Sequence, residues 1–369
     1  MVEWKKLEEV CEILDSQRKP VAKGNRNQGI YPYYGANGIQ DYVDDYIFDG
    51  TFLLLGEDGS VINKDKSPVL HWATGKIWVN NHAHILKENN NALLRFIFYI
   101  LQCTDVSDIV RGVPPKINQA NMRNIQLPVP SISEQKRIAG ILDTFTASID
   151  NLKKQIFQRR KQYEYYRDQL HDLEGKEGVE MKTLGEIGDF IRGNGIQKND
   201  FAEEGYGCVH YGQIHARYGF SAVETISKIE ESLYKKCKKA QKGDVILATT
   251  SEDAEGVAKP FVWLGDEKVA VSGDAFIYHH NQNGKFMGYQ FLTHKFMQFK
   301  VKYATGAKVV RISGDNMAKY EVALPSIDKQ NEIVDILDKF EASIQNLEAQ
   351  LSQREKQYEY YRNKLLTFE

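Results

Sequence analysis

Apolar residues recur at alternating spacings of four and three positions in two long stretches of the chain. They are Ile138, Leu142, Phe145, Ile149, Leu152, Ile156, Tyr163, Tyr166 and Leu170 in the first stretch, and Ile333, Leu337, Phe340, Ile344, Leu347, Leu351, Tyr358, Tyr361 and Leu365 in the second. Arg159 interrupts the first series. Such heptads are typical of helices that pair as a coiled coil. A helix of about 37 residues would be roughly 55 Å long.

The two stretches are copies of one another. Residues 130–170 align with residues 325–365 at a constant offset of 195, and 25 of the 41 positions are identical. A Leu-x-Glu motif at Leu7 also recurs at Leu184, with an offset of 177. Duplication of this kind indicates a repeated structural element. The sequence therefore predicts a variable domain, a repeated helix with a linker, a second variable domain and a second repeated helix, at residues 1–129, 130–178, 179–324 and 325–369.

Polar residues and glycines mark the expected ends of the helices. Ser131 and Glu134 have the spacing of a capping box at the start of the first helix, whereas the second helix has Lys329 in place of the glutamate, so that Asp328 is its expected cap. Gly175 and Gly178 are expected to close the first helix and open a linker.

The second variable domain connects the end of the first helix to the start of the second. Because the termini of a compact domain are often close together, this connection favours antiparallel pairing of the helices. Two independent amphipathic helices, each lying on its own domain, are the alternative. The predicted fold class is α+β, with two strand-rich α/β domains separated by an antiparallel coiled coil of pseudo-two-fold symmetry.

Short apolar runs within the variable domains read as strands between Gly, Asn and Asp turns. The expected strands lie at residues 51–55, 77–79, 244–248 and 269–271. Helices are expected at residues 92–102 and 286–299.

The composition is that of an ordinary globular protein, with 42% hydrophobic and 27% charged residues. The 48 Lys and Arg against 50 Asp and Glu give a net charge of −2, which excludes a general polyanion binder. Four scattered cysteines favour neither a disulfide scaffold nor a zinc knuckle, so a reducing cytoplasm is the expected compartment. No apolar stretch is long enough to predict a membrane partner.

Common catalytic motifs are missing from the sequence. It contains no phosphate-binding G-x-x-x-x-G-K-[ST] loop, no H-E-x-x-H and no G-x-S-x-G, nor the signatures of amino-methyltransferases and nucleases. His82-x-His84 has a spacing that could hold a metal, but two ordinary polar positions on a strand are the favoured interpretation. No metal site or enzyme active site is therefore predicted.

Local charge is more informative than the net charge. Residues 275–314 contain no Asp or Glu. This stretch carries Lys285, Lys295, Lys300, Lys302, Lys308 and Arg311. Residues 66–87 and 109–133 of the first variable domain are likewise free of acids. Such cations would neutralise phosphates of a nucleic acid, and a solvated charged face is the alternative.

Polar loop residues beside these cations are candidates for contacts with base edges. Lys116-Ile-Asn118 aligns with Arg311-Ile-Ser313 at the offset of 195. At the offset of 177, Tyr34 falls on Tyr211. The full set of candidate DNA contacts is Tyr34, Asn37, Arg111, Lys116, Asn118, Arg192, Asn194, Gln197, Tyr211, Gln213, Thr250, Ser251, Lys308, Arg311 and Ser313. Ordinary turn chemistry is the alternative for each of them.

The whole chain resembles the specificity subunit of type I restriction-modification systems. The resemblance rests on Pro-Ser-Ile-x-x-Gln at residues 130–135 and 325–330, on the duplicated helices that follow, and on the segment 303–313. Lys329 stands where members of this family usually have Glu.

The resemblance implies that each variable domain is a target-recognition domain for one half of a bipartite, asymmetric site in double-stranded DNA. The helices would set the spacer between the half-sites. Two methyltransferase subunits that bind S-adenosylmethionine, and restriction subunits that use ATP and Mg²⁺, would supply the chemistry. This chain is accordingly expected to be non-catalytic and to bind no cofactor itself.

The repeated helices are also candidates for docking the two methyltransferase subunits. Gln135 and Gln330 in the Pro-Ser-Ile-x-x-Gln motifs, and Tyr165 and Tyr360 outside the heptad positions, are the candidate contacts. A solvated helix face is the alternative. Two further functions stay open, namely a stand-alone DNA-modifying enzyme and a non-catalytic coiled-coil tether with two ligand-binding heads.

Overall fold

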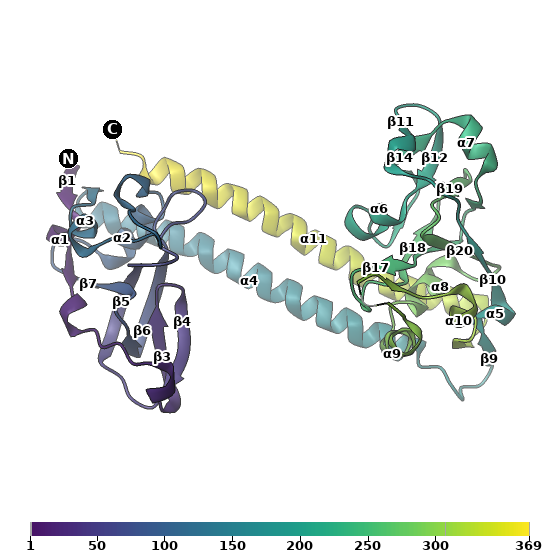
Figure 1. Cartoon of the computed structure of the whole chain (residues 1–369), viewed down its shortest axis with the longest axis horizontal. Helices are drawn as coiled ribbons and strands as arrows, with labels where there is room; N and C mark the ends of the chain where they lie inside the picture. The colour runs from purple at the N-terminus through teal and green to yellow at the C-terminus, as the bar shows by residue number, and fades with distance from the viewer. Residues whose placement is uncertain (1, 307, 369) are drawn as a thin grey trace. The chain divides into compact units, whose positions relative to one another are not determined.

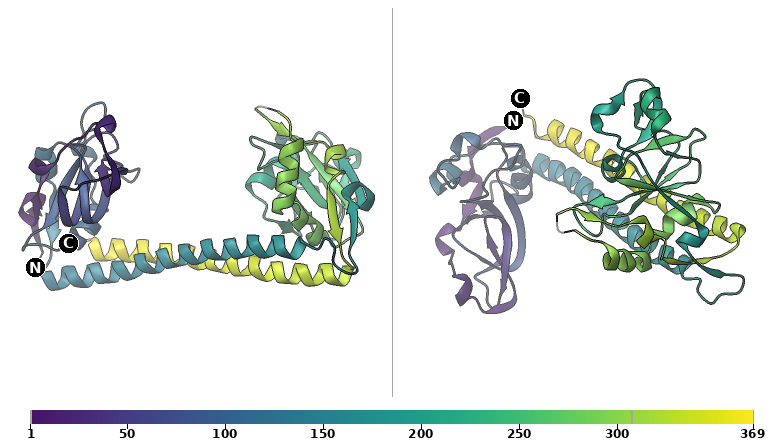
Figure 2. Two further views of the ribbon diagram at one scale, coloured as in Figure 1. Left: turned by 90° about the horizontal axis from the view of Figure 1, so that it is seen from below. Right: turned by 45° about the vertical axis from the view of Figure 1, so that its right-hand side comes forward.

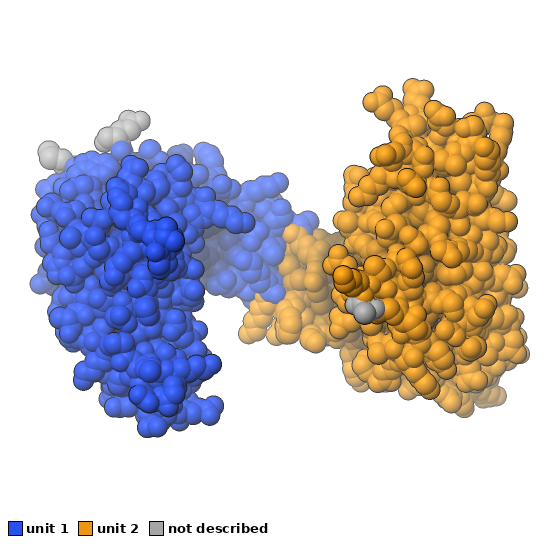
Figure 3. Space-filling model, viewed as in Figure 1, with its two compact units in different colours: residues 1–153, 349–369 blue, residues 154–348 orange. Residues whose placement is uncertain are grey.

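The computed structural model describes residues 2–306 and 308–368. The chain divides into two compact units, of which unit 1 comprises residues 1–153 and 349–369 and unit 2 comprises residues 154–348 (Figure 3). Each unit contains a globular part and portions of the two long helices α4 (Ile132–His171) and α11 (Ile327–Leu366). None of the helices in the described ranges has the length and hydrophobicity of a membrane span.

The globular part of unit 1 is built on a six-stranded sheet (Figure 1). Its order is β2 (Cys11–Ile13), β7 (Ala83–Glu88), β5 (Phe48–Gly56), β6 (Leu70–Val79), β3 (Gln28–Gly35) and β4 (Gly38–Val43). All pairs are antiparallel except β3 with β6. The strands predicted at 51–55 and 77–79 lie inside β5 and β6, and the helix predicted at 92–102 is α2 (Leu94–Leu101).

Strand β5 is buried on both of its faces. Leu53 and Leu55 belong to the core that also contains Phe96 of α2, whereas Phe52 and Leu54 belong to a second core on the other face. This division follows from the two-residue period of a strand, which sends successive side chains to opposite faces.

Unit 2 contains two five-stranded sheets. The first has the order β10 (Gly188–Arg192), β20 (Ala275–His280), β16 (Val245–Ala248), β18 (Lys259–Trp263) and β13 (Ser221–Ala222). The second has the order β11 (Phe201–Ala202), β14 (Ser227–Ile229), β12 (Tyr206–Val209), β19 (Val269–Val271) and β15 (Lys239–Ala240). The strands predicted at 244–248 and 269–271 are confirmed as β16 and β19.

The prediction of one helix at 286–299 is wrong, because this segment forms two helices, α8 (Gly284–Gln290) and α9 (His294–Tyr303). Thr293 separates them, and its side-chain oxygen accepts a hydrogen bond from the Phe296 backbone N at 3.2 Å. A threonine hydroxyl at this position favours a helix start over continuation of the preceding helix.

In each globular part, the first and last strands pair with each other as a two-stranded ribbon, and the two ribbons are equivalent. In unit 1, β1 (Glu3–Lys6) pairs with β8 (Gln126–Val129), and in unit 2, β9 (Glu180–Thr183) pairs with β22 (Glu321–Leu324). The backbone N of Leu7 donates to the Ile125 carbonyl, and that of Leu184 to the Tyr320 carbonyl, at 2.9 Å in both cases. The recurring Leu-x-Glu motif thus marks one local structure that occurs twice.

The two long helices run antiparallel in each unit (Figure 2). In unit 1 the rings of Phe145 and Tyr361 stack with their centroids 5.3 Å apart, and in unit 2 the rings of Tyr166 and Phe340 stack at 5.4 Å. Within unit 1 Lys153 also pairs with Glu355, and within unit 2 Arg160 pairs with Glu348, so in each unit the residue number on α11 falls as that on α4 rises. Antiparallel pairing and the pseudo-two-fold repetition are thereby confirmed, although Tyr166 and Tyr361 remain 46% and 42% exposed at their predicted seam positions.

The ends of these helices differ in part from expectation. Ser131 accepts a hydrogen bond from the Glu134 backbone N at 3.4 Å, which is one half of the predicted capping box, whereas the Glu134 carboxylate pairs with Arg137 at 2.6 Å. At the second helix Ser326 does the same for the Lys329 backbone N at 3.4 Å, so the assignment of Asp328 as the cap is wrong. The proline-serine pair before each helix was duplicated together with the helix, which explains the shared cap. Helix α4 already ends at His171, four residues before Gly175.

Equivalent hydrogen bonds join each globular part to one of the long helices. The carboxamide oxygen of Gln135 accepts from the Leu93 backbone N at 2.8 Å, and that of Gln330 accepts from the Asn283 backbone N at 3.1 Å. Each Nε2 donates to the proline carbonyl five residues earlier, at 2.9 Å in both units. These contacts hold the start of α2 against α4 in unit 1, and the start of α8 against α11 in unit 2.

A second contact, six residues further along each short helix, is also repeated. The hydroxyl of Tyr99 donates to Asp143 at 2.6 Å, and that of Tyr289 donates to Asp338 at 2.8 Å. The cation four residues before each tyrosine pairs with the same aspartate at 2.6 Å. Both globular parts therefore contact the long helices through equivalent side chains, although their sheets differ.

Candidate nucleic-acid interface

In unit 2, distant segments of the chain meet at the two-stranded ribbon formed by β17 (Thr250–Ser251) and β21 (Val310–Arg311). Thr250 pairs with Arg311, and Ser251 with Val310. Reciprocal backbone hydrogen bonds of 2.8 and 2.9 Å between Thr305 and Arg311 close the loop that precedes β21. Lys308 lies in this loop with its side chain exposed.

A hollow of about 330 Å³ lies on one side of the ribbon. Four of the predicted DNA-contacting residues line it, namely Arg192, Thr250, Arg311 and Ser313. Arg192 is oriented by a 2.9 Å hydrogen bond from its Nε to the Gly273 carbonyl. The structure thus brings together cationic and hydroxyl side chains that are far apart in the sequence.

A second hollow, of about 420 Å³, also borders on Thr250. It is lined by Tyr211, Ser251, His215, Glu252, Asp253 and Val309 in addition. The hydroxyl oxygen of Thr250 is buried, and it has no hydrogen-bond partner within the described part of the chain. A buried hydroxyl without a partner is uncommon and indicates a group available to a ligand.

Lys300 holds the loop that forms one wall of this second hollow. Its side chain is buried, and its Nζ donates to the carbonyls of Glu255 and Val257 at 2.5 and 2.8 Å. Burial lowers the pKa of Lys300 to about 8, with partial opposition from the charges of Asp253 and Glu255. Lys300 therefore acts on the loop from inside the fold and does not contribute to the cationic surface.

The predicted cationic surface is smaller than the acid-free stretch 275–314 suggested. Lys285 pairs with Asp338 at 2.6 Å, and Lys295 pairs with Glu174 at 3.2 Å. Within residues 275–314, the exposed cations that have no ion pair with a described residue are Lys302, Lys308 and Arg311. The acids that pair with the other lysines come from α11 and from the linker after α4, so a run without acids in the sequence does not produce a surface without acids.

Three further candidates in unit 2 lie outside these hollows. Gln213 is buried and its Nε2 donates to the Ser227 hydroxyl at 2.6 Å. Asn194 accepts a hydrogen bond from the Lys238 backbone N. Because the Gln213 amide is already engaged inside the fold and lines neither hollow, it does not fit direct contact with DNA, whereas Gln197 is exposed beside a short helical turn.

In unit 1, Asn37 is exposed at the turn between β3 and β4, but Tyr34 is only 9% exposed and packs in the core. Its burial does not fit the predicted DNA contact. Tyr34 lies inside strand β3, whereas Tyr211 opens helix α6 (Tyr211–Ala216), so the two aligned tyrosines have different structural settings.

Unit 1 has a polar hollow of about 420 Å³ that sequence reasoning missed. Its polar lining includes Arg26, Gln40, Asn80, Asn81 and His82. The guanidinium of Arg26 lies 4.1 Å from the centre of the Tyr33 ring and pairs with Asp41 at 3.2 Å. The polar run 80–82 directly after the predicted strand 77–79 was the available signal in the sequence.

The remaining candidates of unit 1 lie on the segment 111–118. Arg111 is exposed, whereas Lys116 pairs with Glu57 at 3.1 Å. Asn118 accepts from the Asn121 backbone N at 2.8 Å and thereby caps α3 (Gln119–Arg123). Ser313 caps α10 (Gly314–Met317) in the same way, so the aligned pattern Lys116-Ile-Asn118 and Arg311-Ile-Ser313 encodes a shared helix start.

The segment 111–118 is tied to a buried charge network in unit 1. His84 is fully buried, with Nδ1 2.6 Å from Asp15 and Nε2 2.8 Å from the Ile117 carbonyl. Since both partners only accept hydrogen bonds, both ring nitrogens are donors. Burial alone would raise the pKa of Asp15, but the hydrogen bond and charge of His84 hold it below its usual value.

This network does not have the chemistry of a metal site, although Asp15, Glu57 and His84 lie close together. The Arg18 guanidinium pairs with Glu57 at 2.5 Å and with Asp15 at 3.5 Å, so both carboxylates already face a cation. His82 pairs with Asp58 instead. The arrangement agrees with the preference for ordinary polar roles of His82 and His84.

The predicted docking residues divide into two groups. Gln135 and Gln330 are fully buried in the contacts described above, which does not fit a docking role. Tyr165 and Tyr360 are 60% and 59% exposed. Each packs edge-on against the next tyrosine along its helix, with ring centroids 5.4 and 5.3 Å apart. The structure thus presents one aromatic surface twice.

Comparison with known proteins gives concordant results. Residues 1–159 and 176–355 match the family described as the type I restriction modification DNA specificity domain. The chain is 32% identical to a putative type I restriction enzyme specificity subunit of Haemophilus influenzae, with 100% of this chain and 96% of the relative covered. It is 28% identical to the EcoR124I/EcoR124II specificity subunit of Escherichia coli, with 89% of each covered.

Solved structures share the fold. The S subunit of a type I restriction-modification system from M. genitalium has a TM-score of 0.65 at 15% identity, with 100% of this chain and 97% of that chain covered. A chain from a structure described for complex assembly and conformational transition of the type I R-M system has a TM-score of 0.56 at 15% identity, with 99% and 96% covered.

Proposed function

Because the chain belongs to the type I restriction-modification DNA specificity family, we propose that it reads a bipartite DNA sequence, with each globular part recognising one half-site. One observation carries this proposal. The two globular parts have different sheets, but each is joined to the duplicated helices by a ribbon of the same register and by equivalent glutamine and tyrosine contacts. Recognition of two different half-sites requires two different globular parts that are attached to the helices in the same way.

In unit 2 the ribbon β17–β21 supplies suitable chemistry for the second half-site. Arg311 and Lys308 are exposed cations that would neutralise phosphates, and the hydroxyl of Thr250 makes no hydrogen bond to any described residue. In unit 1 the polar hollow lined by Gln40 and Asn81 offers exposed carboxamides, which suit hydrogen bonding to base edges.

The long helices set the unread spacer in this proposal. A duplex turn is about 34 Å long, so two recognition parts on one chain engage two half-sites only when the spacing matches the helical phase of the DNA. Simultaneous engagement then raises the effective affinity beyond that of either half-site alone.

The chain acts together with methyltransferase and restriction subunits and is itself non-catalytic in this proposal. The methyltransferases bring S-adenosylmethionine, and the restriction subunits bring ATP and Mg²⁺. The duplicated tyrosine pairs that include Tyr165 and Tyr360 support two equivalent docking sites, because the same exposed aromatic surface occurs once on each long helix.

Duplex binding and methyl transfer, measured side by side, test this proposal. The purified chain should transfer no labelled methyl group from S-adenosylmethionine to DNA, whereas the chain with its methyltransferase should do so, with salt-dependent duplex binding. Methyl transfer by the chain alone would support a stand-alone enzyme. An absence of salt-dependent duplex binding by the complex would support a tether with two ligand-binding heads.

A further inference from the structure

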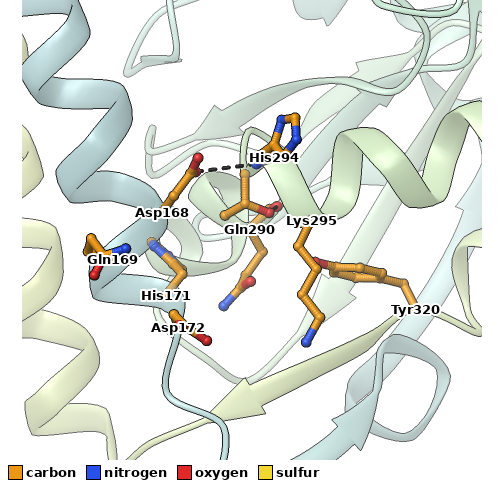
Figure 4. Close-up of a pocket in the computed structure, with 9 residues that line it drawn as sticks. Asp168, Gln169, His171, Asp172, Gln290, His294, Lys295 and Tyr320 are labelled. Carbon is orange, nitrogen blue, oxygen red and sulfur yellow. Dashed lines mark hydrogen bonds between the residues drawn. The ribbon is translucent and has the colours of Figure 1, made fainter.

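A polar hollow of about 200 Å³ lies in unit 2 at the end of α4 (Figure 4). Asp168, His171 and Asp172 line it from α4 and the residues that follow, and Gln290 and Lys295 line it from the α8–α9 segment. It is separate from the hollows beside the ribbon β17–β21, with which it shares no lining residue.

Two buried side chains present unused hydrogen-bonding atoms here. His171 is 8% exposed, and its Nδ1 lies 2.8 Å from the Arg167 carbonyl. Burial lowers the pKa of His171 to about 4, although the carbonyls of Arg167 and Phe286 oppose the shift. The neutral ring therefore carries its proton on Nδ1 and offers Nε2 as an acceptor. Gln290 is 3% exposed, and neither its Nε2 nor His171 Nε2 has a hydrogen-bond partner among the described residues.

The corresponding place in unit 1 shows that the fold does not require a polar hollow. The offset of 195 relates His171 to Leu366, and the offset of 190 that relates α8 to α2 takes Gln290 to Ile100. Leu366 and Ile100 belong to one buried apolar core. Two side chains of one apolar core in unit 1 are thus replaced in unit 2 by two polar side chains, each with one nitrogen that has no hydrogen-bond partner among the described residues, which disfavours folding unless a ligand completes them.

The charges around the hollow define what it can hold. Asp172 and the acceptor atom of His171 stand at the carbonyl end of α4, which favours donors and positive charge, whereas Asp168 already pairs with Arg167 at 2.9 Å and accepts from the His294 backbone N at 3.3 Å. The Gln290 amide and the Lys295 ammonium lie on the other wall, although Lys295 also pairs with Glu174. Asp168, His171 and Asp172 do not form a cluster of metal-ligand size within the described residues, so a bare metal ion does not fit.

We propose that this hollow binds a small dipolar organic molecule, of which free α-amino acids and their amides are the simplest members. Its amine donates to His171 Nε2 on the side of the two aspartates, and its carboxylate or carboxamide oxygen accepts from Gln290 Nε2. The inference does not depend on DNA recognition, because none of its observations involves the candidate DNA contacts.

Titration of the full-length chain with pooled, then single, free amino acids and amino-acid amides tests this proposal, with the ring resonances of His171 as the readout. The wild-type chain should show saturable one-site binding of at least one probe. Gln290→Met removes the donor at similar volume and should weaken binding about tenfold or more. The double variant His171→Leu/Gln290→Ile, which takes the residues of unit 1, should lose binding and unfold at the same or a higher temperature.

Two results would overturn the proposal. The first is an absence of saturable binding to the wild-type chain by every probe at millimolar concentration, which would mean that the hollow holds water only. The second is unchanged affinity in Gln290→Met. This single substitution is milder than the double replacement, so the proposal can still be tested if the double variant does not fold. Neither result bears on duplex binding or methylation, so this inference and the proposed DNA-reading function can fail separately.

Discussion

Thr250 pairs with Arg311 across the two-stranded ribbon of unit 2, and this pairing places a buried hydroxyl beside an exposed guanidinium. Two hollows meet at Thr250, and Arg311 borders on one of them. The ribbon therefore combines a group suited to phosphate with a group suited to a base edge. The predictions for the second half-site follow from this arrangement.

Lys308→Ala should weaken duplex binding with little dependence on DNA sequence, because Lys308 is an exposed cation with no ion pair among the described residues. We expect the slope of log K against log salt to fall in magnitude by about one. Affinities measured at several salt concentrations, with Lys242→Ala as a control cation already paired to Asp266 on the surface, check this. A change in sequence preference would instead make Lys308 a base-reading residue.

Thr250→Val should change base preference in one half-site without lowering stability. The replacement keeps the shape of the side chain and removes a buried hydroxyl that has no partner in the described structure. Loss of a base contact should reduce discrimination by about 1–3 kcal/mol at one position. Binding to a panel of single-base variants of the site measures this, and an unchanged profile would exclude Thr250 as a reader.

Lys300→Met should remove a pH dependence of stability. Because the pKa of Lys300 is lowered to about 8 in the folded chain, the unfolded chain binds more protons above that pH, and this group makes stability rise with pH from about 8 toward its ordinary value of 10.5. The titration of Lys300 changes the free energy of unfolding by at most roughly 1.4 kcal/mol per pH unit.

Urea unfolding of the wild type and of Lys300→Met between about pH 7.5 and 9.5 isolates this contribution, because every other titrating group is common to both chains. Identical pH slopes in the two proteins would contradict the role of Lys300. The replacement should also relax specificity in the second half-site only, since it loosens the loop 255–257 that the ammonium holds.

Gln330→Leu should lower the free energy of unfolding by about 1–3 kcal/mol, because it leaves the Asn283 backbone N without its acceptor. Gln135→Leu is the matched change in unit 1 and should behave alike.

Tyr165→Ala and Tyr360→Ala should instead weaken methyltransferase binding and leave unfolding nearly unchanged, since both rings are largely exposed. Calorimetric titration with the methyltransferase distinguishes the two groups, and a reversed pattern would contradict the assignment.

The helices and their pairing were predictable because periodicity and duplication are local properties of the sequence. The linkage through the second variable domain then indicated the antiparallel direction. The break at Thr293 was missed because the apolar residues continue on both sides of it, and the Ser326 cap was missed in favour of its neighbour Asp328.

The candidate site depended on tertiary contacts that the sequence does not display. Arg192, Thr250 and Arg311 meet only through the sheet and the ribbon. Lys285 and Lys295 were expected on a cationic surface, but acids from other segments pair with them. Gln135 and Gln330 were expected to face a partner, yet their repetition reflects a shared internal contact.

Removal of one heptad from both long helices tests the spacer role. Seven residues correspond to roughly 10 Å of helix, or about three base pairs of duplex. We expect the preferred gap between half-sites to shorten, or binding to the bipartite site to be lost, while each half-site keeps its sequence. Unchanged gap preference, measured with duplexes of varied spacer length, would contradict the role of the helices.

The central claim is that one chain reads two separate half-sites, and the modified bases of a genome report on it directly. The chain should be co-expressed with its methyltransferase in a host without DNA methylation, and methylated adenines mapped. The account predicts one gapped, two-part motif, of which one half changes when residues 1–129 are exchanged and the other half changes when residues 179–324 are exchanged. A contiguous motif, or no methylation despite a stable complex, would contradict it.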